Sequence, residues 1–426
     1  MSYFRNQGES NGHPGGSLPR ELAVFLLVVV ILWAISLIDV FHQFGAIGPS
    51  RFLLLIYGAP QGDLLCCEDN FRALHTVSFF TQGFVWNYPA PCVFIYRLFY
   101  LFWPTGQGSN AVVAVYFATA VLPIIGCCIL LENALHRRGL TRTWAIFVVV
   151  ATAILSWPIY YSLHRGNIES LLWVWLALAV LLYVRRQGMP AAILIGILTA
   201  FKIYPIIFFA LFLRPRRYRE IAAGLAAGLV TTIGSLLYLG PTLKGAAWYT
   251  LRGIHYFVQS FSSHYTLWGL RVDHSAFILV KLLSATHPQS LPAYLPLYEL
   301  FIGVIALVCF FARTWKMPRP NQVLMLTAAM VVLPATSFDY TLQSLYIPWA
   351  WLALLIVSAH RAGKRVPGAM PAMLCFAVLL APEMFLEFGG RSLAGPLKAL
   401  TLIALIGISM IYSFPEEDRN PGEAAA

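Results

Sequence analysis

The sequence has few charged residues, and acidic residues are especially rare. Asp, Glu, Lys and Arg make up 11% of the 426 residues, and only 18 residues are Asp or Glu. In a typical soluble domain about a quarter of the residues are charged, so this composition excludes an ordinary soluble enzyme. Apolar stretches of about 18–25 residues, long enough to cross a bilayer, recur along the chain. They are continuous rather than alternating, which excludes a β-barrel. We therefore predict an all-α, polytopic membrane protein of the helical type.

The chain also lacks the cysteine and histidine spacing of a zinc site. Four of its seven cysteines lie in apolar stretches and are expected to pack as small apolar side chains: Cys127, Cys128, Cys309 and Cys375. A disulfide from Cys92 to Cys66 or Cys67 is conceivable outside the membrane, but we expect free thiols because nothing in the sequence fixes their separation. No zinc-ligand pattern occurs. We expect no metal and no other cofactor, unless Asp69 and Asp339 meet in space and chelate an ion.

The positive charge is concentrated in short loops. The net charge is +11, and clusters of Lys and Arg separate the apolar stretches at 137–142, 185–186, 214–219, 313–319 and 361–365. Short basic loops mark the cytoplasmic side of a membrane protein. Because topology alone requires them, we expect no nucleic-acid binding.

The same pattern predicts a single transmembrane domain with about ten to twelve spans. We expect spans at 21–43, 110–134, 143–162, 168–184, 220–240, 296–313, 321–336, 341–359, 368–388 and 394–413. Residues 1–20 are expected to form a cytoplasmic tail, 21–413 the domain, and 414–426 a disordered tail. The first apolar run is too long for the core of a cleavable signal peptide.

Two further apolar segments do not fit as simple spans. Residues 91–103 are short and contain Arg97, so we predict an interfacial helix on the outer surface. Residues 190–213 have arginines at both ends, and Pro205 breaks the helix. Lys202 lies in the middle of this segment, where a charge is costly unless it faces a cavity or a counter-charge. We therefore predict a re-entrant hairpin with Lys202 near its tip.

Polar residues outside the predicted spans gather in a few segments. The richest is an island at 62–91, which holds Asp63, Glu68 and Asp69 and closes on the aromatic and proline-rich run 86–91. A carboxylate beside aromatic residues at a membrane surface can act as a general base on a lipid-borne substrate. The other external segments are the loop 162–168, a long loop at 241–295 and the turn 337–340.

These segments suggest a site with one base and several cations. His164 and Arg165 lie at a loop tip, Lys202 in the hairpin, and Asp339 at the outer end of a span. Cations would stabilise a phosphate leaving group while a carboxylate removes a proton from the acceptor. Each residue also has a structural explanation. Loop carboxylates are commonly solvated, His164 and Arg165 can anchor a span at lipid headgroups, and Asp339 can cap the next helix beside an interfacial Tyr340.

Three passages, in order, carry a family resemblance. The first is the acidic loop Glu68–Phe71 followed by Asn87-Tyr88-Pro89-Ala90-Pro91, the second is RGNIESLL at 165–172, and the third is AAILIGILTAFKIYPIIFFALFLRPRRYR at 191–219. Together they resemble glycosyltransferase family 87 of the GT-C superfamily, a group that contains polyprenol-phosphate-mannose-dependent mannosyltransferases. The resemblance spans about residues 20–360, and Asp339-Tyr340 is similar to a polar turn found late in the family.

The resemblance implies a polyprenyl-phosphate sugar donor in the outer leaflet and an acidic catalytic base in the first external loop. By position relative to Gly83 and Tyr88, Asp69 is the best match for the base, with Glu68 and Asp63 as alternatives. A single displacement with one base would invert the anomeric centre. We predict the following substrate-binding residues: Asn87, Tyr88, His164, Arg165, Asn167, Lys202, His264, Asp339 and Tyr340. Of these, His264 lies in the aromatic-rich loop 241–295, which is expected to meet the acceptor or the sugar.

We therefore predict an inverting hexosyltransferase, with mannose as the expected sugar and a lipid or cell-envelope glycan as acceptor. It would be a multi-pass protein of the cell inner (plasma) membrane with its active site on the extracytoplasmic face. A transporter or flippase of lipid-linked sugars would use the same cationic cavity without a base. A non-catalytic scaffold of an envelope assembly is a third interpretation, but it leaves Lys202 and the acidic pair unexplained.

Overall fold

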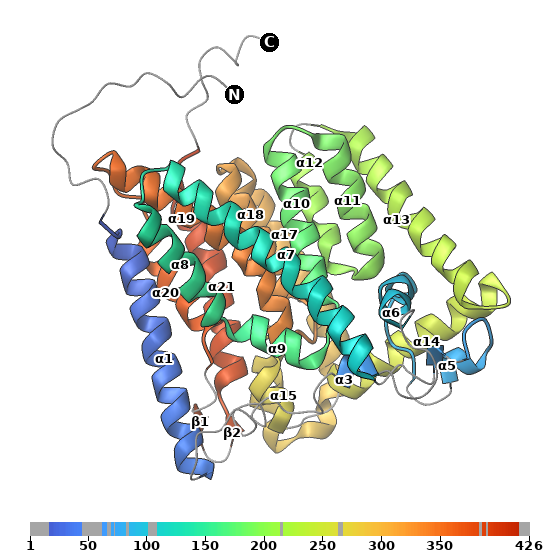
Figure 1. Ribbon diagram of the computed structural model, residues 1–426. Coiled ribbons are helices and arrows are strands. Elements are labelled where there is room, and N and C mark those ends of the chain that lie inside the picture. Colours follow the sequence, from blue (N-terminus) through green and yellow to red (C-terminus); the bar gives the residue numbers. More distant parts are fainter. Residues whose placement is uncertain are drawn as a thin grey trace.

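The computed structural model describes residues 17–44, 62–65, 70–71, 73–81, 85–100, 109–213, 216–262, 267–382, 386–388 and 391–416. Within these ranges the chain is almost entirely helical (Figure 1). The only strands there are the two-residue β1 (Glu387–Phe388) and β2 (Arg391–Ser392), which pair antiparallel. The predicted all-α class is confirmed.

The α-helices, in chain order, are α1 (Arg20–Phe44), α3 (Gly62–Leu65), α5 (Ser78–Thr81), α6 (Cys92–Tyr100), α7 (Ser109–Arg137), α8 (Arg142–Ile154), α9 (Trp157–Arg165), α10 (Glu169–Val184), α11 (Gly188–Phe201), α12 (Ala210–Leu213), α13 (Tyr218–Leu239), α14 (Leu243–Ser262), α15 (Leu267–Val272), α16 (Phe277–Leu283), α17 (Leu291–Ala312), α18 (Arg319–Val332), α19 (Tyr346–Arg361), α20 (Ala369–Leu380) and α21 (Ala394–Ile411). Short 3₁₀ segments are η1 (Tyr204–Phe209), η2 (Ser284–Thr286), η3 (Pro288–Ser290), η4 (Thr314–Lys316) and η5 (Asp339–Leu345).

Six helices in the described ranges are individually long and apolar enough to cross a membrane. Helices α8 and α9 make a seventh candidate span, bent by 46° at the break between them. The predicted ten to twelve spans exceed this number because apolar helices such as α10, with 16 residues, and α20, with 12, are shorter than a full span. The hydropathy pattern located these segments but could not show how much of each is helical.

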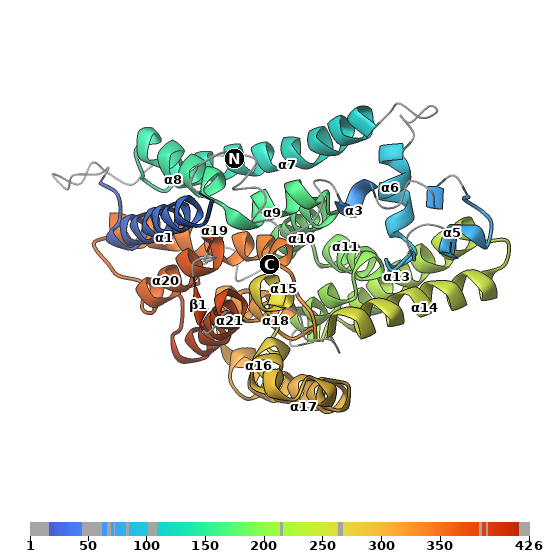
Figure 2. The same cartoon turned by 90° about the horizontal axis from the view of Figure 1, so that it is seen from below.

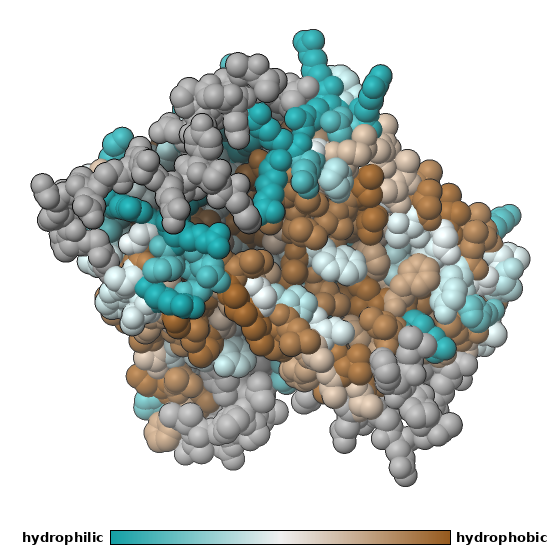
Figure 3. Space-filling model, turned by 45° about the horizontal axis from the view of Figure 1, so that its top comes forward, coloured by the Kyte–Doolittle hydropathy of each residue, from teal (hydrophilic) through white to brown (hydrophobic). Residues whose placement is uncertain are grey.

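The outer helices carry apolar side chains on their outward faces. Val230 of α13 is 71% exposed and Leu300 of α17 is 63% exposed. Figure 2 shows α17 at the rim of the molecule, and Figure 3 shows apolar residues across the middle of one face with hydrophilic residues gathered toward one end. So much exposed apolar surface is expected against lipid rather than water. The protein is therefore a multi-pass membrane protein.

The basic loops lie together at one end of the bundle, as the topology predicts (the top of Figure 1). Arg138 donates a 2.9 Å hydrogen bond to Ser358 Oγ near the end of α19. The guanidinium of Arg319 lies over the ring of Tyr183, 5.8 Å from its centroid, near the end of α10. These contacts tie the connections of α7, α10, α17 and α19 to the same face.

The predicted re-entrant hairpin is present. Helix α11 ends at Phe201, and the chain resumes at η1, where Pro205 occupies the first turn as proline favours. The two ends of the hairpin lie together, because a Cβ on Gly188 would come 2.5 Å from Nη1 of Arg217. Hence the chain enters from the basic end, turns at Lys202 and returns to the same end.

Glycine allows the hairpin to pack closely against α13. A Cβ on Gly196 would lie 1.8 Å from the carbonyl oxygen of Gly224, and one on Gly228 would lie 2.7 Å from the carbonyl oxygen of Gly196. Only residues without a side chain permit such an approach between helix backbones. The depth of Lys202 in the bundle therefore depends on these glycines.

Two segments differ from the sequence-based expectation. Six of the nine residues of α6 are buried, so this helix is packed into the bundle rather than lying on its surface. Its Cys92 is a free thiol that donates a hydrogen bond to the carbonyl of Phe201 at 3.3 Å.

The segment 241–295, which was expected to be a loop, is mostly helical in its described part. Its 20-residue α14 buries Ala246, Thr250 and Gly253 at helical spacing, an amphipathic pattern that its polar content obscured.

Candidate active site

Lys202 is held between two aromatic rings at the tip of the hairpin. Its Nζ lies 5.5 Å from the ring centroid of Tyr88 and 5.8 Å from that of Tyr340. Both distances are within the range of a cation–π interaction. Three predicted substrate-binding residues from distant parts of the sequence are thus brought together.

Glu169 is a buried carboxylate near the half-buried Lys202, although the two side chains do not form a direct ion pair. Its side chain stands at the start of α10, is 1% exposed, accepts a hydrogen bond from the Tyr204 hydroxyl and interacts electrostatically with Lys202. A buried carboxylate without a partner would be strongly destabilising. Sequence reasoning did not select Glu169, although a rare acidic residue heading an apolar helix was a usable signal.

Asp63, in α3, contacts the turn between α9 and α10. Its Oδ1 accepts from the guanidinium of Arg165, and its Oδ2 accepts a 2.8 Å hydrogen bond from Asn167 Nδ2. Both carboxylate oxygens are therefore engaged. Gly62 lies directly beside this pair, with its Cβ position 3.4 Å from Nη1 of Arg165.

The turn that presents Arg165 and Asn167 is fixed from within the bundle. Gly166 adopts the left-handed conformation (φ 69°) that ends α9, which glycine accepts without strain. The hydroxyl of Tyr116 lies 3.1 Å from the carbonyl oxygens of Ser162 and Asn167. The Asn167 side chain in turn accepts from the Glu169 N–H at 3.0 Å.

The two groups of residues belong to one site. Tyr340 lies in η5, which packs against α9, the helix that ends at Arg165. Its ring stacks on that of Tyr161, with centroids 5.9 Å apart. We define the candidate site as Tyr88, Lys202 and Tyr340 together with Asp63, Arg165 and Asn167; α3 and α9, which contribute to it, lie in the half of the molecule away from the basic loops (Figure 1).

Asp339 is part of a buried ion pair. It is 1% exposed and accepts hydrogen bonds from Lys398 Nζ at 2.9 Å and Trp157 Nε1 at 2.7 Å. His274 Nδ1 lies 3.4 Å away, and burial lowers the pKa of this imidazole, which favours its neutral form. This arrangement favours a role for Asp339 in holding η5, and with it Tyr340, rather than the predicted direct contact with substrate.

The structure shows fewer contacts for the other residues predicted to act in catalysis or substrate binding. His164 is buried beside Arg165, and Asn87 is half-buried where α14 packs against the chain. Glu68, Asp69 and His264 lie outside the described residues. Leu64 and Phe71, which lie on either side of Glu68 and Asp69 in the sequence, both contact Tyr100. Tyr100 donates a 2.6 Å hydrogen bond to the Leu64 carbonyl, and its ring stacks on that of Phe71 with centroids 4.9 Å apart.

Comparison of the sequence with known proteins shows which family the chain belongs to. Residues 86–337, more than half of the chain, match the family model described as glycosyltransferase family 87. The chain belongs to glycosyltransferase family 87. It is also 25% identical over 303 residues to the GPI alpha-1,4-mannosyltransferase I, catalytic subunit, of Danio rerio, an alignment that covers 68% of this chain and 75% of that protein.

This member of family 87 is thus a membrane glycosyltransferase. The matched range contains Tyr88, Arg165 and Lys202 and ends at residue 337. It is narrower than the expected range of about 20–360, and the acidic candidates at 63–69 precede it. Among the described residues no group of three or more His, Cys, Asp or Glu side chains could hold a metal ion.

Proposed function

We propose that this protein transfers a hexose, most simply mannose, from a polyprenyl-phosphate sugar to a lipid or cell-envelope glycan acceptor. The main supporting observation is that Lys202 lies at the tip of the re-entrant hairpin between Tyr88 and Tyr340. Tyr340 in turn stacks on Tyr161, one turn before Arg165 on α9. The name of the Danio rerio relative supports mannose as the sugar.

Lys202 and Arg165 are proposed to bind the donor phosphate. A guanidinium has five N–H donors, so Arg165 can contact a phosphate oxygen while Asp63 holds its Nη2. As the bond from the sugar carbon to the phosphate oxygen breaks, negative charge grows on the phosphate. Fixed cations stabilise that charge more in the transition state than in the bound donor.

The two tyrosines are proposed to position the sugar. An aromatic face stacks on the apolar face of a pyranose, and the rings of Tyr88 and Tyr340 flank the Lys202 ammonium. A phosphate held at Lys202 would therefore place the attached sugar beside one of these rings.

Asp69 is proposed as the base, with Glu68 and Asp63 as alternatives. The base takes the proton of an acceptor hydroxyl, the acceptor oxygen forms a bond to the anomeric carbon, and the polyprenyl phosphate leaves. One such displacement inverts the configuration. The hydrogen bonds from Arg165 and Asn167 to both oxygens of Asp63 favour a positioning role for that carboxylate.

We further propose that the site faces the extracytoplasmic side of the inner (plasma) membrane and belongs to a single domain at 21–413. The basic loops gather at the end of the bundle away from α3 and α9 (Figure 1). Basic loops are retained in the cytoplasm, which would leave the candidate site on the opposite side.

The test is a turnover assay in nanodiscs with radiolabelled polyprenyl-phosphate mannose and a membrane lipid extract as acceptor. We expect label in a new product with wild type and none with Asp69→Asn, while the variant still binds donor. Absence of transfer from this donor by wild type would overturn the mannose assignment. Donor translocation across a liposome bilayer without any transfer would instead identify a flippase.

A further inference from the structure

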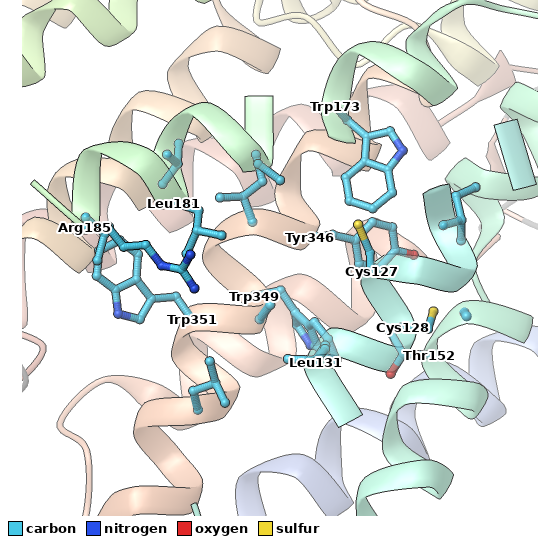
Figure 4. A pocket seen from close by; sticks show the side chains of 18 of the residues that line it. Cys127, Cys128, Leu131, Thr152, Trp173, Leu181, Arg185, Tyr346, Trp349 and Trp351 are labelled. Carbon is cyan, nitrogen blue, oxygen red and sulfur yellow. The ribbon is translucent and has the colours of Figure 1, made fainter. Parts of the chain in front are cut away.

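A large cavity lies apart from the candidate active site. It has a volume of about 760 Å³, is partly open to the surface and is lined mainly by α7, α8, α10 and α19 (Figure 4). None of the six residues that define the candidate site lines it. Most of its wall is apolar, with Ile124, Leu131, Val180, Leu181, Ile347 and Leu354 among the lining residues. A space of this kind suits a hydrocarbon chain and does not suit a sugar.

One end of the cavity is strongly positive. Arg138, Arg185, Arg186 and Arg319 line it, against the single carboxylate of Glu416. Arg185 and Arg186 are exposed, and in Figure 4 the side chain of Arg185 reaches over the cavity beside Leu181 and Trp351. These arginines belong to the basic end of the molecule. A ligand that fills the cavity would therefore place an anionic group at this end.

The depth of the cavity matches one leaflet of a bilayer. Along α10 its lining runs from Trp173 to Arg185, which is about 18 Å at a rise of about 1.5 Å per residue. Half of a typical hydrocarbon core is about 15 Å. An acyl chain with its headgroup at the arginines would thus reach the level of Trp173.

We propose that this cavity binds one anionic glycerophospholipid from the leaflet next to the basic loops. Its phosphate would lie among the four arginines, and one acyl chain would fill the space between α7, α8, α10 and α19. A neutral lipid is disfavoured because Glu416 would then be the one acidic group in the lining against four arginines.

The deep end of the cavity adjoins the elements that carry the candidate site. Trp173 lies one turn after Glu169 on α10, and Tyr346 begins α19 directly after η5. The rings of Trp173 and Tyr346 are 5.8 Å apart and both residues line the cavity. A bound chain would therefore support the packing that positions Glu169 and Tyr340. This consequence rests on the proposed function, whereas lipid binding itself does not.

Native mass spectrometry of the full-length protein, released from nanodiscs of phosphatidylglycerol and phosphatidylcholine, tests the proposal. We expect one retained phosphatidylglycerol in wild type. Arg185→Gln/Arg186→Gln should reduce its retention roughly tenfold or more, as the loss of two basic contacts to an anionic lipid predicts. Lys364→Gln/Arg365→Gln removes equal charge from the same end of the molecule without touching the cavity, and should leave retention unchanged.

A second variant separates a built cavity from surface adsorption. Ala177→Phe fills the cavity from α10 and leaves every arginine in place, so it should abolish retention; Ala153→Phe does the same from α8 if the first variant does not fold. Equal retention in wild type and all variants, or none in wild type, would overturn the proposal. Retention of polyprenyl phosphate in preference to phosphatidylglycerol would overturn the glycerophospholipid assignment. None of these readouts requires glycosyl transfer, so failure of the proposed function would be seen separately.

Discussion

The ammonium of Lys202 lies 5.8 Å from the ring centroid of Tyr340, although one residue is at the tip of the re-entrant hairpin and the other is in η5 near the start of α19. The buried carboxylate of Glu169 lies near Lys202. A fixed cation in such a site is well placed to bind a phosphate. The role of Lys202 in catalysis and its coupling to Glu169 can be tested separately.

Lys202→Met should lower kcat/KM by about 100-fold or more, because losing one fixed group that stabilises developing charge costs a factor of that order. The measurement is steady-state transfer from the lipid-linked donor. Lys364→Met, at the basic end, is the matched control and should have wild-type activity. Unchanged turnover in Lys202→Met would remove the lysine from the mechanism.

Replacing Glu169 as well should restore part of the stability that Lys202→Met loses. The single variant leaves the buried Glu169 carboxylate without a nearby cation, which should cost at most about 3 kcal/mol, because the two charges do not form a direct ion pair. Glu169→Gln/Lys202→Met removes both charges and should have a higher Tm than Lys202→Met in the same detergent, although it stays inactive. Additive losses of stability would show that the two residues are not coupled.

Asp69→Asn should reduce turnover by about 100-fold or more while donor affinity changes little, as expected for loss of a general base. Asp63→Asn should behave differently. It weakens the hold on Arg165, so KM for the donor should rise more than kcat falls. If Asp69→Asn retains wild-type turnover and Asp63→Asn or Glu68→Gln does not, the base is reassigned to that residue.

The pair of Asp339 and Lys398 is expected to be structural. Lys398→Ala should destabilise the protein by about 3–5 kcal/mol, because it leaves a buried carboxylate unpaired. Asp339→Asn/Lys398→Met should recover much of that loss, which a double-mutant cycle of unfolding free energies would measure. A raised donor KM at unchanged stability would instead support the predicted substrate contact of Asp339.

Gly196→Ala should separate α11 from α13 and displace the hairpin tip, because the new Cβ would lie 1.8 Å from the Gly224 carbonyl oxygen. We expect a lower Tm and weaker donor binding. Gly234→Ala on α13 has no atom within 4 Å of the new Cβ and should be neutral. Equal behaviour of the two variants would argue against a close helix contact at Gly196.

Full activity in excess EDTA is expected for a reaction that uses a carboxylate base and fixed cations. The assay is the same transfer reaction before and after chelation, with Mg²⁺ or Mn²⁺ added back. Loss of activity on chelation and its recovery on adding back the ion would contradict the prediction and would direct attention to Asp69 and its neighbours as ligands.

The hairpin shows how far local sequence can predict a structural feature. The segment has arginines at both ends, Pro205 within it and a lysine in its apolar middle. Few structures are compatible with all three features, because an unpaired charge in an apolar bundle is costly. The same reasoning failed for α14, where polar residues at helical spacing were interpreted as a loop. The hydropathy of a segment indicates whether it lies in water or in lipid, but it does not indicate whether one face of the segment packs against other helices.

The sequence by itself determined the membrane class, the shared side of the basic loops and the family resemblance, because each follows from composition, from charges close together in the chain or from short motifs. Only the tertiary structure decided that Glu169 lies near Lys202, that Asp63 holds Arg165 and Asn167, that Asp339 pairs with Lys398, and that four arginines meet at one cavity. These pairings join residues far apart in the chain. A buried charge in the sequence indicates that a partner is required, but it does not indicate which residue that partner is. The packing of the helices decides which residues come into contact.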